Sequence, residues 1–77
     1  MSKWIQVRVD EGLFPSERTV HFDTVEGEIS VFVSSNQLEA GKLRVVVLDE
    51  DAEHALVQVQ SHGGGTVAKV SRSNVLA

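Results

Sequence analysis

His21 and Asp23 are the side chains whose type and spacing come closest to a chemical site. They lie two residues apart in a stretch where apolar and polar residues alternate. On a β-strand this spacing places both on one face, within reach of one metal ion. A zinc site would need a third and a fourth ligand, and nothing in the sequence places them. We therefore expect polar surface residues here and no metal site.

Two further segments contain residue types that occur at catalytic or ion-binding sites. His62-Gly63-Gly64-Gly65 is similar to an esterase oxyanion loop, but that loop works beside a Gly-x-Ser-x-Gly nucleophile turn, which the chain lacks. Loops that bind phosphate through backbone amides normally precede a helix, and here we expect a strand. The acidic run 49–54 lacks the alternating ligands and central glycine of a calcium loop. Both segments are therefore predicted to be turns.

The sequence also contains Ser, His and Asp residues, but nothing in it arranges them as a catalytic triad. No nucleophile, base and orienting group occur at a recognisable spacing. We therefore expect no catalytic, cofactor-binding or metal-binding residues, and a protein that is not an enzyme.

Composition and length limit the classes of protein to consider. Seventy-seven residues, 42% hydrophobic and 23% charged, are typical of one folded domain spanning 1–77. The absence of cysteine excludes disulfides and thiolate zinc sites and favours the cytoplasm. No segment approaches the roughly 20 apolar residues of a membrane span. The net charge of −4 argues against general attraction to nucleic acid.

Apolar residues alternate over short runs of the sequence, and no helical period is sustained. β-strands therefore position the polar residues described above. We predict an all-β fold: a small antiparallel barrel of five or six strands. The run Leu43–Leu48 is nearly all apolar, which predicts a strand covered on both faces. The expected core consists of alternating apolar residues: Ile5, Val7, Val20, Phe22, Ile29, Val31 and Val45.

The two parts of the chain also match each other, which predicts two pseudo-repeats of three strands over residues 3–38 and 42–76. Each part closes with an apolar strand followed by Ser-Asn, one variable residue and leucine. These leucines, Leu38 and Leu76, are expected to fill equivalent ends of the barrel. Ser and Asn favour a single capped helical turn before Leu38. The further matched segments are Ile5–Val9 with Leu43–Val47, Val20–Phe22 with Val57–Val59, and Gly27 with Gly65.

The second half of the chain resembles the C-terminal half of a Src-homology-3 domain. In that family a strand and an acidic turn lead to a second strand, a glycine-containing turn, a short strand and a helical turn with the sequence Pro-Ser-Asn-Tyr-Val. About 35 residues here follow that order: Leu43–Leu48, Asp49–Glu53, Ala55–Gln60, Gly63–Gly65, Val67–Val70 and Ser71-Arg72-Ser73-Asn74-Val75-Leu76. The resemblance implies a small barrel.

The chain departs from that family at the residues that bind proline-rich ligands. It contains no tyrosine, and Ala55 and Leu56 stand where the family has paired tryptophans. Arg72 replaces the proline of the terminal motif and Val75 its tyrosine. The resemblance therefore does not imply binding of a PxxP peptide.

Three aromatic residues lie outside the predicted core series and indicate a contact surface. Trp4 and Phe32 alternate with core residues, and Phe14 lies in a loop beside Pro15. Exposed aromatics are typical of interfaces, although Trp4 and Phe32 could instead cover the edge of a small barrel. We expect a non-catalytic protein-interaction or accessory module that binds another protein or a second copy through Trp4, Phe14, Phe32 and Arg72.

A nucleic-acid-associated small barrel is the alternative function. It rests on four basic residues expected near the strand ends: Lys42, Arg44, Lys69 and Arg72.

Overall fold

The computed structural model describes residues 2–11, 15–61 and 64–76, which form an all-β fold. The all-β prediction is confirmed. The described residues contain nine strands and two short 3₁₀ turns, η1 and η2. In chain order they are β1 (Ser2–Gln6), β2 (Arg8–Glu11), β3 (Glu17–Thr24), β4 (Gly27–Ser34), η1 (Ser35–Gln37), β5 (Leu38–Glu39), β6 (Lys42–Glu50), β7 (His54–Ser61), β8 (Gly64–Ser71), η2 (Arg72–Asn74) and β9 (Val75–Leu76).

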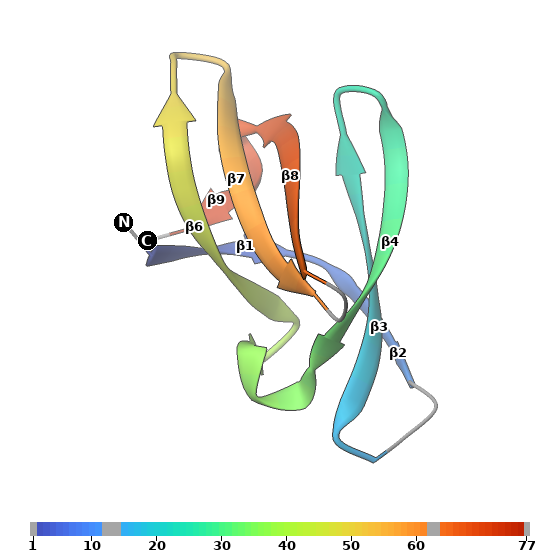
Figure 1. Ribbon diagram of the computed structural model, residues 1–77. Coiled ribbons are helices and arrows are strands. Elements are labelled where there is room, and N and C mark those ends of the chain that lie inside the picture. The colour runs from blue at the N-terminus through green and yellow to red at the C-terminus, as the bar shows by residue number, and fades with distance from the viewer. Residues whose placement is uncertain (1, 12–14, 62–63, 77) are drawn as a thin grey trace.

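The sequence predicted a small antiparallel barrel, and the described strands form two antiparallel sheets that do not make a closed barrel. Sheet A has the order β8-β7-β6-β1-β9, with β5 also paired to β6, and sheet B has the order β2-β3-β4. Figure 1 shows the β3–β4 hairpin of sheet B standing beside β6, β7 and β8 of sheet A. Strand β3 contacts β8 and β4 contacts β7. Among the described residues, a backbone hydrogen bond from Val25 N to Lys69 O at 2.9 Å links the β3–β4 turn to β8, and no ladder joins β4 to β8, so the barrel is not closed.

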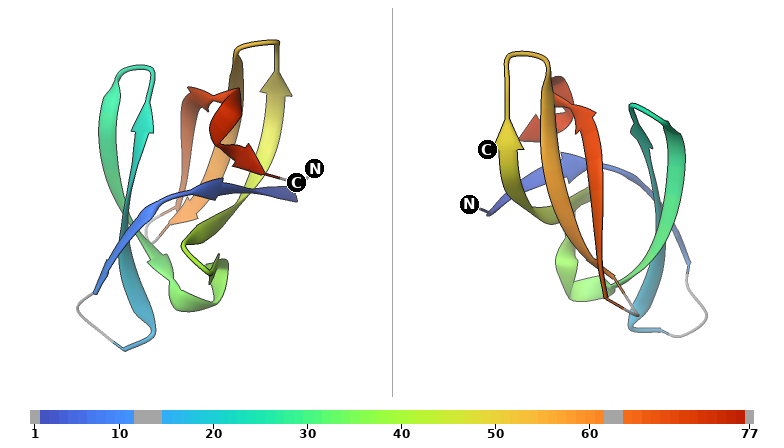
Figure 2. Two further views of the ribbon diagram at one scale, coloured as in Figure 1. Left: turned by 180° about the vertical axis from the view of Figure 1, so that it is seen from behind. Right: turned by 45° about the horizontal axis from the view of Figure 1, so that its top comes forward.

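The two sheets are joined at their other side by one bent segment, β1 followed by β2. Figure 2 shows this segment crossing from sheet A to sheet B. Up to Gln6 the chain pairs with β6, and from Arg8 onward it pairs with β3. At the bend, the backbone N–H of Val7 donates to the carbonyl of Gly41 at 3.1 Å. The strand therefore changes partner without leaving this backbone donor unpaired.

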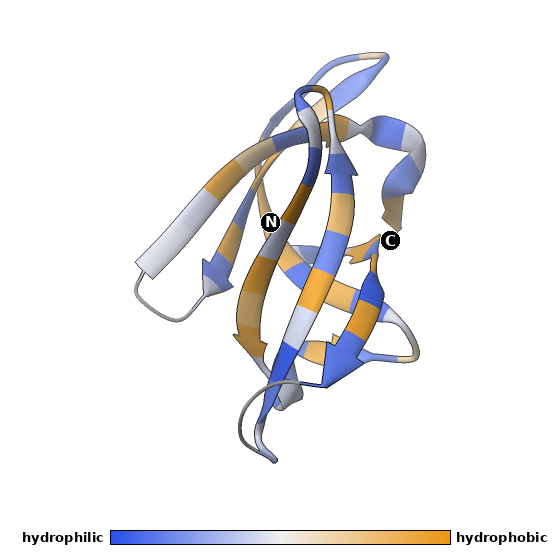
Figure 3. Cartoon of the chain, turned by 90° about the vertical axis from the view of Figure 1, so that its right-hand side faces the viewer, coloured by the Kyte–Doolittle hydropathy of each residue, from blue (hydrophilic) through white to orange (hydrophobic). Residues whose placement is uncertain are grey.

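Alternation of apolar and polar residues along the strands sets the core between the sheets, as the hydropathy colouring in Figure 3 shows. Four of the predicted core residues are buried: Ile5, Val20, Phe22 and Val45. The other three pack against the core while partly exposed: Val7, Ile29 and Val31. The remaining buried apolar residues are Val33, Leu43, Ala55, Val57, Val59, Ala68 and Val70.

Strand β6 was predicted to be covered on both faces, but it is covered on one face only. Leu43 and Val45 are buried, whereas Val46 and Leu48 are 38% and 49% exposed. A run of apolar residues cannot by itself distinguish a strand buried on both faces from one with an apolar outer face. The outer face of β6 therefore adds apolar surface to the protein.

The hairpins of the two halves correspond at an offset of 37 residues, and each hairpin is followed by a 3₁₀ turn and a two-residue strand, η1 with β5 and η2 with β9. Ser35 N donates to Ser16 O, and Arg72 N donates to Glu53 O. In the two hairpin turns Thr24 Oγ1 donates to Gly27 O and Ser61 Oγ to Gly64 O, and both glycines have positive φ. Only glycine adopts such φ values without strain.

The offset of 37 shifts the matching predicted from Ser-Asn-x-Leu by one residue. Leu38 pairs with Leu43, and in the second half Val75, not Leu76, pairs with Ile5. Leu38 and Val75 both pack against the core, whereas Leu76 is paired with Trp4. The expectation that Leu76 is equivalent to Leu38 is therefore wrong.

Within the described ranges, no helix is long and apolar enough to cross a membrane.

Candidate functional site

Trp4 lies on the outer face of sheet A beside two basic side chains from β6. Its neighbour in the strand, Ile5, is buried in the core, so Trp4 points outward. Lys42 Nζ and the guanidinium carbon of Arg44 lie 5.6 and 5.5 Å from the centre of its ring. Both are cation–π distances. On the other side Trp4 pairs with Leu76, so its ring is half-buried by neighbours on its own sheet.

Three aliphatic residues on the same outer face form what we call the sheet A patch: Val46, Leu56 and Val67. Val46 and Val67 are each paired across the sheet with Gln58. Leu56, two residues from Gln58 in β7, is their diagonal neighbour, within side-chain reach. The exposed fractions are 38%, 36% and 52% for the three residues. Contiguous apolar surface on a small protein is typical of a contact site.

The structure does not bring the predicted contact residues together. Phe32 is 47% exposed and pairs with Thr19 on the outer face of sheet B, whereas Trp4 lies on sheet A. Phe14 lies outside the described residues. Arg72 starts η2, where its Nη1 donates to the Asp51 carbonyl at 3.2 Å and its Nε lies 3.8 Å from a Glu50 carboxylate oxygen. Arg72 thus holds the turn between β6 and β7.

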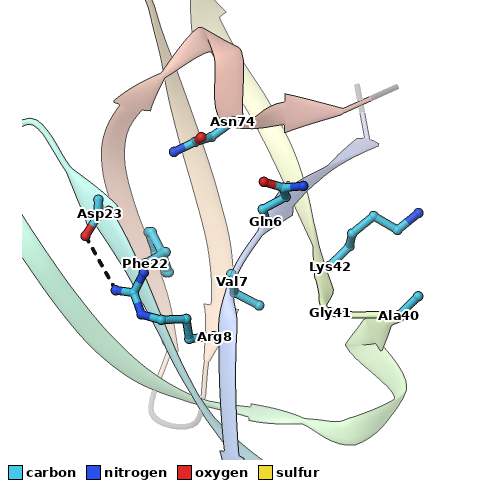
Figure 4. Close-up of a pocket in the computed structure, with 9 residues that line it drawn as sticks. All are labelled: Gln6, Val7, Arg8, Phe22, Asp23, Ala40, Gly41, Lys42 and Asn74. Carbon is cyan, nitrogen blue, oxygen red and sulfur yellow. Dashed lines mark hydrogen bonds and ion pairs between the residues drawn. The ribbon is translucent and has the colours of Figure 1, made fainter.

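A cleft of about 460 Å³, here called the first cleft, opens where β1 bends away from the end of β3. Figure 4 shows Gln6, Asn74 and the Arg8–Asp23 pair around it, while Lys42 points away from that pair. Arg8 Nη2 lies 3.5 Å from Asp23 Oδ1. The complete lining is Gln6, Val7, Arg8, Phe22, Asp23, Ala40, Gly41, Lys42 and Asn74.

Electrostatics in the first cleft are nearly balanced. Arg8 also donates to Glu28, and this hydrogen bond with its charge raises the pKa of the guanidinium. Arg8 thus lies beside the carboxylates of Asp23 and Glu28, and Lys42 also lines the cleft. A charged ligand would meet a like charge here, whereas a neutral polar group meets both donors and acceptors.

A second cleft, of about 240 Å³, occupies the corresponding place in the other half. It is lined by Gln37, Arg44, Val45, Val46, Gln58 and Gln60. At the offset of 37, Gln37 stands where Asn74 does and Gln60 where Asp23 does. The Gln37 carboxamide crosses this cleft, since its Nε2 donates to the Gln60 carbonyl at 2.8 Å. Its Oε1 accepts from Ser34 N at 3.0 Å.

Asp10, His21 and Ser30 form a hydrogen-bonded row on the outer face of sheet B. His21 Nδ1 lies 2.6 Å from Ser30 Oγ, and His21 Nε2 lies 2.8 Å from Asp10 Oδ2. These residue types match a catalytic triad, and the sequence did not predict their proximity because three different strands supply them. The row lies on a solvated sheet face, where the Asp10 side chain is 72% exposed. A triad needs preorganised oxyanion donors and exclusion of water. His21 and Asp23 do not join a metal-binding group of three or more ligands among the described residues.

Comparisons with known proteins identify no relative. No family model matches the chain, and no curated protein or solved structure matches it.

Sequence reasoning missed the first cleft because its lining comes from both halves. Gln6, Asp23 and Asn74 are ordinary surface residue types. The sequence did contain a sign that Asn74 and Gln37 are equivalent, because each lies three residues after a serine, Ser71 and Ser34. Matching the Ser-Asn pairs instead concealed this equivalence.

Proposed function

We propose that the protein is a non-catalytic interaction module that binds a second copy of itself or another protein through the outer face of sheet A. The observation that carries this proposal is the sheet A patch of Val46, Leu56 and Val67, with Trp4 on the same face. Burial of exposed apolar area stabilises association by about 25 cal/mol per Å² before the entropic costs. A cytoplasmic location belongs to this proposal and rests on the absence of cysteine.

The electrostatics support a contact on sheet A. All of the formal excess of negative charge comes from residues 8–34, which contain six acidic and two basic residues; the other residues contain five of each. Sheet A, built mostly from the balanced part, carries less self-repulsion than sheet B. A protein contact therefore has a smaller electrostatic cost on sheet A.

Two exposed valines provide a matched test of this proposal. Val67 lies in the sheet A patch and is 52% exposed; Val25 lies in the β3–β4 turn and is 49% exposed. Val67→Glu is expected to weaken self-association or partner binding by at least about tenfold, whereas Val25→Glu leaves it unchanged. Equal effects of the two substitutions on association would contradict a contact on sheet A.

The environment of Trp4 also favours a second candidate, association with single-stranded nucleic acid. An aromatic ring with two cations beside it resembles the stacking sites on which bases lie. Affinity for a poly-dT oligonucleotide should then fall steeply with salt and be lost in Trp4→Ala but not in Trp4→Phe. If the parent protein does not bind poly-dT at low salt, association with single-stranded nucleic acid is excluded.

The absence of catalysis is part of the proposal and is supported by the solvated position of the Asp10–His21–Ser30 row. The parent protein and the Ser30→Ala variant should hydrolyse an activated ester at the same rate. A loss of hydrolysis in Ser30→Ala, with the fold retained, would identify the row as an active site.

We further propose that the chain is a duplication of one unit. The matching order of hairpin, 3₁₀ turn and two-residue strand and the matched hairpin hydrogen bonds support this origin. A relation of the second half to the Src-homology-3 family is a proposal supported by its order of strand, hairpin and 3₁₀ turn.

A further inference from the structure

The second cleft contains its own occupant, the carboxamide of Gln37. That group lies between an acceptor, the Gln60 carbonyl, and a donor, Ser34 N. The hairpins and turns that carry these residues correspond to those of the other half at the offset of 37. The occupied cleft therefore indicates which chemical group fits the corresponding cleft.

In the first cleft the corresponding side chain is one methylene shorter. Asn74 stands at the position of Gln37, and Asp23 at that of Gln60. Among the described residues, no side chain donates to the Asp23 carbonyl, whereas Gln37 donates to the Gln60 carbonyl. The larger volume, about 460 against 240 Å³, agrees with a cleft that Asn74 does not close.

We propose that the first cleft binds a primary carboxamide, the side chain of a glutamine or asparagine presented by a peptide. The amide NH₂ of the ligand would donate to the Asp23 carbonyl, as Gln37 does to Gln60. Its oxygen would accept from the carboxamides of Gln6 or Asn74 or from a free N–H of Arg8, which has five donors. These groups surround the opening in Figure 4.

The charges beside the cleft select the neutral amide. A carboxylate ligand of the same shape would meet the carboxylate of Asp23, which lines the cleft. A lysine-like ligand would meet Arg8 and Lys42, which line the cleft. Glutamine has an NH₂ group where glutamate has a carboxylate oxygen, and the two side chains have nearly the same size. Comparing their affinities therefore distinguishes recognition of the amide from binding by shape alone.

The test is an NMR titration of the ¹⁵N-labelled protein with N-acetylglutamine methylamide, and with the glutamate analogue as control. The glutamine probe is expected to shift the amide resonances of Gln6, Asp23 and Asn74, and the glutamate probe to bind at least about tenfold more weakly. Equal binding of the two probes, or no binding of either, overturns the proposal.

Two reciprocal variants locate the binding. Asn74→Gln lets the chain fill its own cleft, so binding of the probe should fall by at least about tenfold. Gln37→Asn opens the second cleft and should leave the first site unchanged while adding shifts near Gln60. Retained dispersion of the spectrum shows that each variant is folded. Unchanged binding in a folded Asn74→Gln overturns the proposal, whereas self-association through the sheet A patch is independent of this variant, because no patch residue lines the first cleft.

Discussion

Gln37 and Gln60 are joined across the two halves of the chain: Gln37 Nε2 donates to the Gln60 carbonyl at 2.8 Å. Gln37 also accepts from Ser34 N through its other carboxamide atom, so one side chain links a 3₁₀ turn to the end of β7. The corresponding turn η2 ends in Asn74, for which no such bridge is found in the described part of the chain. The side chains at this position in the two clefts thus differ by one methylene, and only the longer one makes the bridge.

Shortening Gln37 should destabilise the protein. Gln37→Asn removes the bridge to Gln60, and a net loss of about 1 kcal/mol in the free energy of unfolding is expected. Asn74→Gln should raise it by a similar amount, because the longer side chain can reach the Asp23 carbonyl. Urea denaturation measures both, with Asn36→Gln, at an exposed neighbouring position, as control. A loss as large in Asn36→Gln would show that the bridge is not the cause.

The C-terminal strand should depend on Val75 more than on Leu76. Val75 packs against the core beside Ile5, and Leu76 lies opposite Trp4 on the outer face. Val75→Ala removes about two buried methylene equivalents and should cost about 1–2 kcal/mol, with Leu76→Ala costing less. Thermal unfolding of the two variants compares them directly. A larger cost for Leu76→Ala would contradict the register of β9.

The β5–β6 turn contains backbone strain at Ala40. Pairing of Glu39 with Lys42 leaves Ala40 and Gly41 as a two-residue loop, with φ values of 52° and 78°. Positive φ at both positions defines a type I′ turn, which favours Asn-Gly. Ala40→Asn should therefore raise stability by about 0.5–1 kcal/mol, and Ala40→Val should lower it. Chemical denaturation measures the free energy of unfolding of both variants. A lower free energy of unfolding in both would argue against a type I′ turn.

Asp51 should contribute a pH-dependent part of the stability. Its Oδ1 accepts from the backbone N–H of Glu53 and of His54, each at 2.8 Å, and these bonds hold the pKa of the carboxyl below its ordinary value. A lowered pKa in the folded state means that this stabilisation is present above the ordinary pKa, about 4, and is lost as the pH falls through the lowered value.

Melting curves from neutral pH down to about pH 2.5 test the role of Asp51. Asp51→Asn keeps an acceptor but cannot titrate, so it should lose part of the acid dependence. Asp51→Ala should be less stable at neutral pH. Glu26→Gln, in the exposed β3–β4 turn, controls for the change in net charge. Identical acid dependence of the parent and Asp51→Asn would contradict this role.

Local patterning predicted the strands well, because β-branched residues at alternate positions fit a pleated surface whatever the partner strand. Ile5, Val20, Phe22 and Val45 were identified as core for that reason. Closure of the barrel was not predictable from such patterns. Closure depends on whether β4 and β8 form a ladder of backbone hydrogen bonds. The structure instead has a backbone hydrogen bond from Val25 in the β3–β4 turn to Lys69 in β8.

The surfaces were harder to predict than the core. The run Leu43–Leu48 has an apolar outer face, since Val46 and Leu48 are exposed, and periodicity does not distinguish such a face from a buried one. The row of Asp10, His21 and Ser30 depends on the register of three strands, which single-sequence patterns do not specify. The prediction for Trp4 as a contact residue stays a prediction.

Self-association through the sheet A patch is best measured as the mass of the protein in solution, by light scattering over a range of concentrations. The chain has a mass of 8.4 kDa. A contact through the patch predicts a mass that rises toward twice this value with concentration and returns to 8.4 kDa in Val46→Glu. A mass that rises equally in the parent and in Val46→Glu would contradict it. So would a monomer at every concentration whose partner binding is unaffected by Val46→Glu.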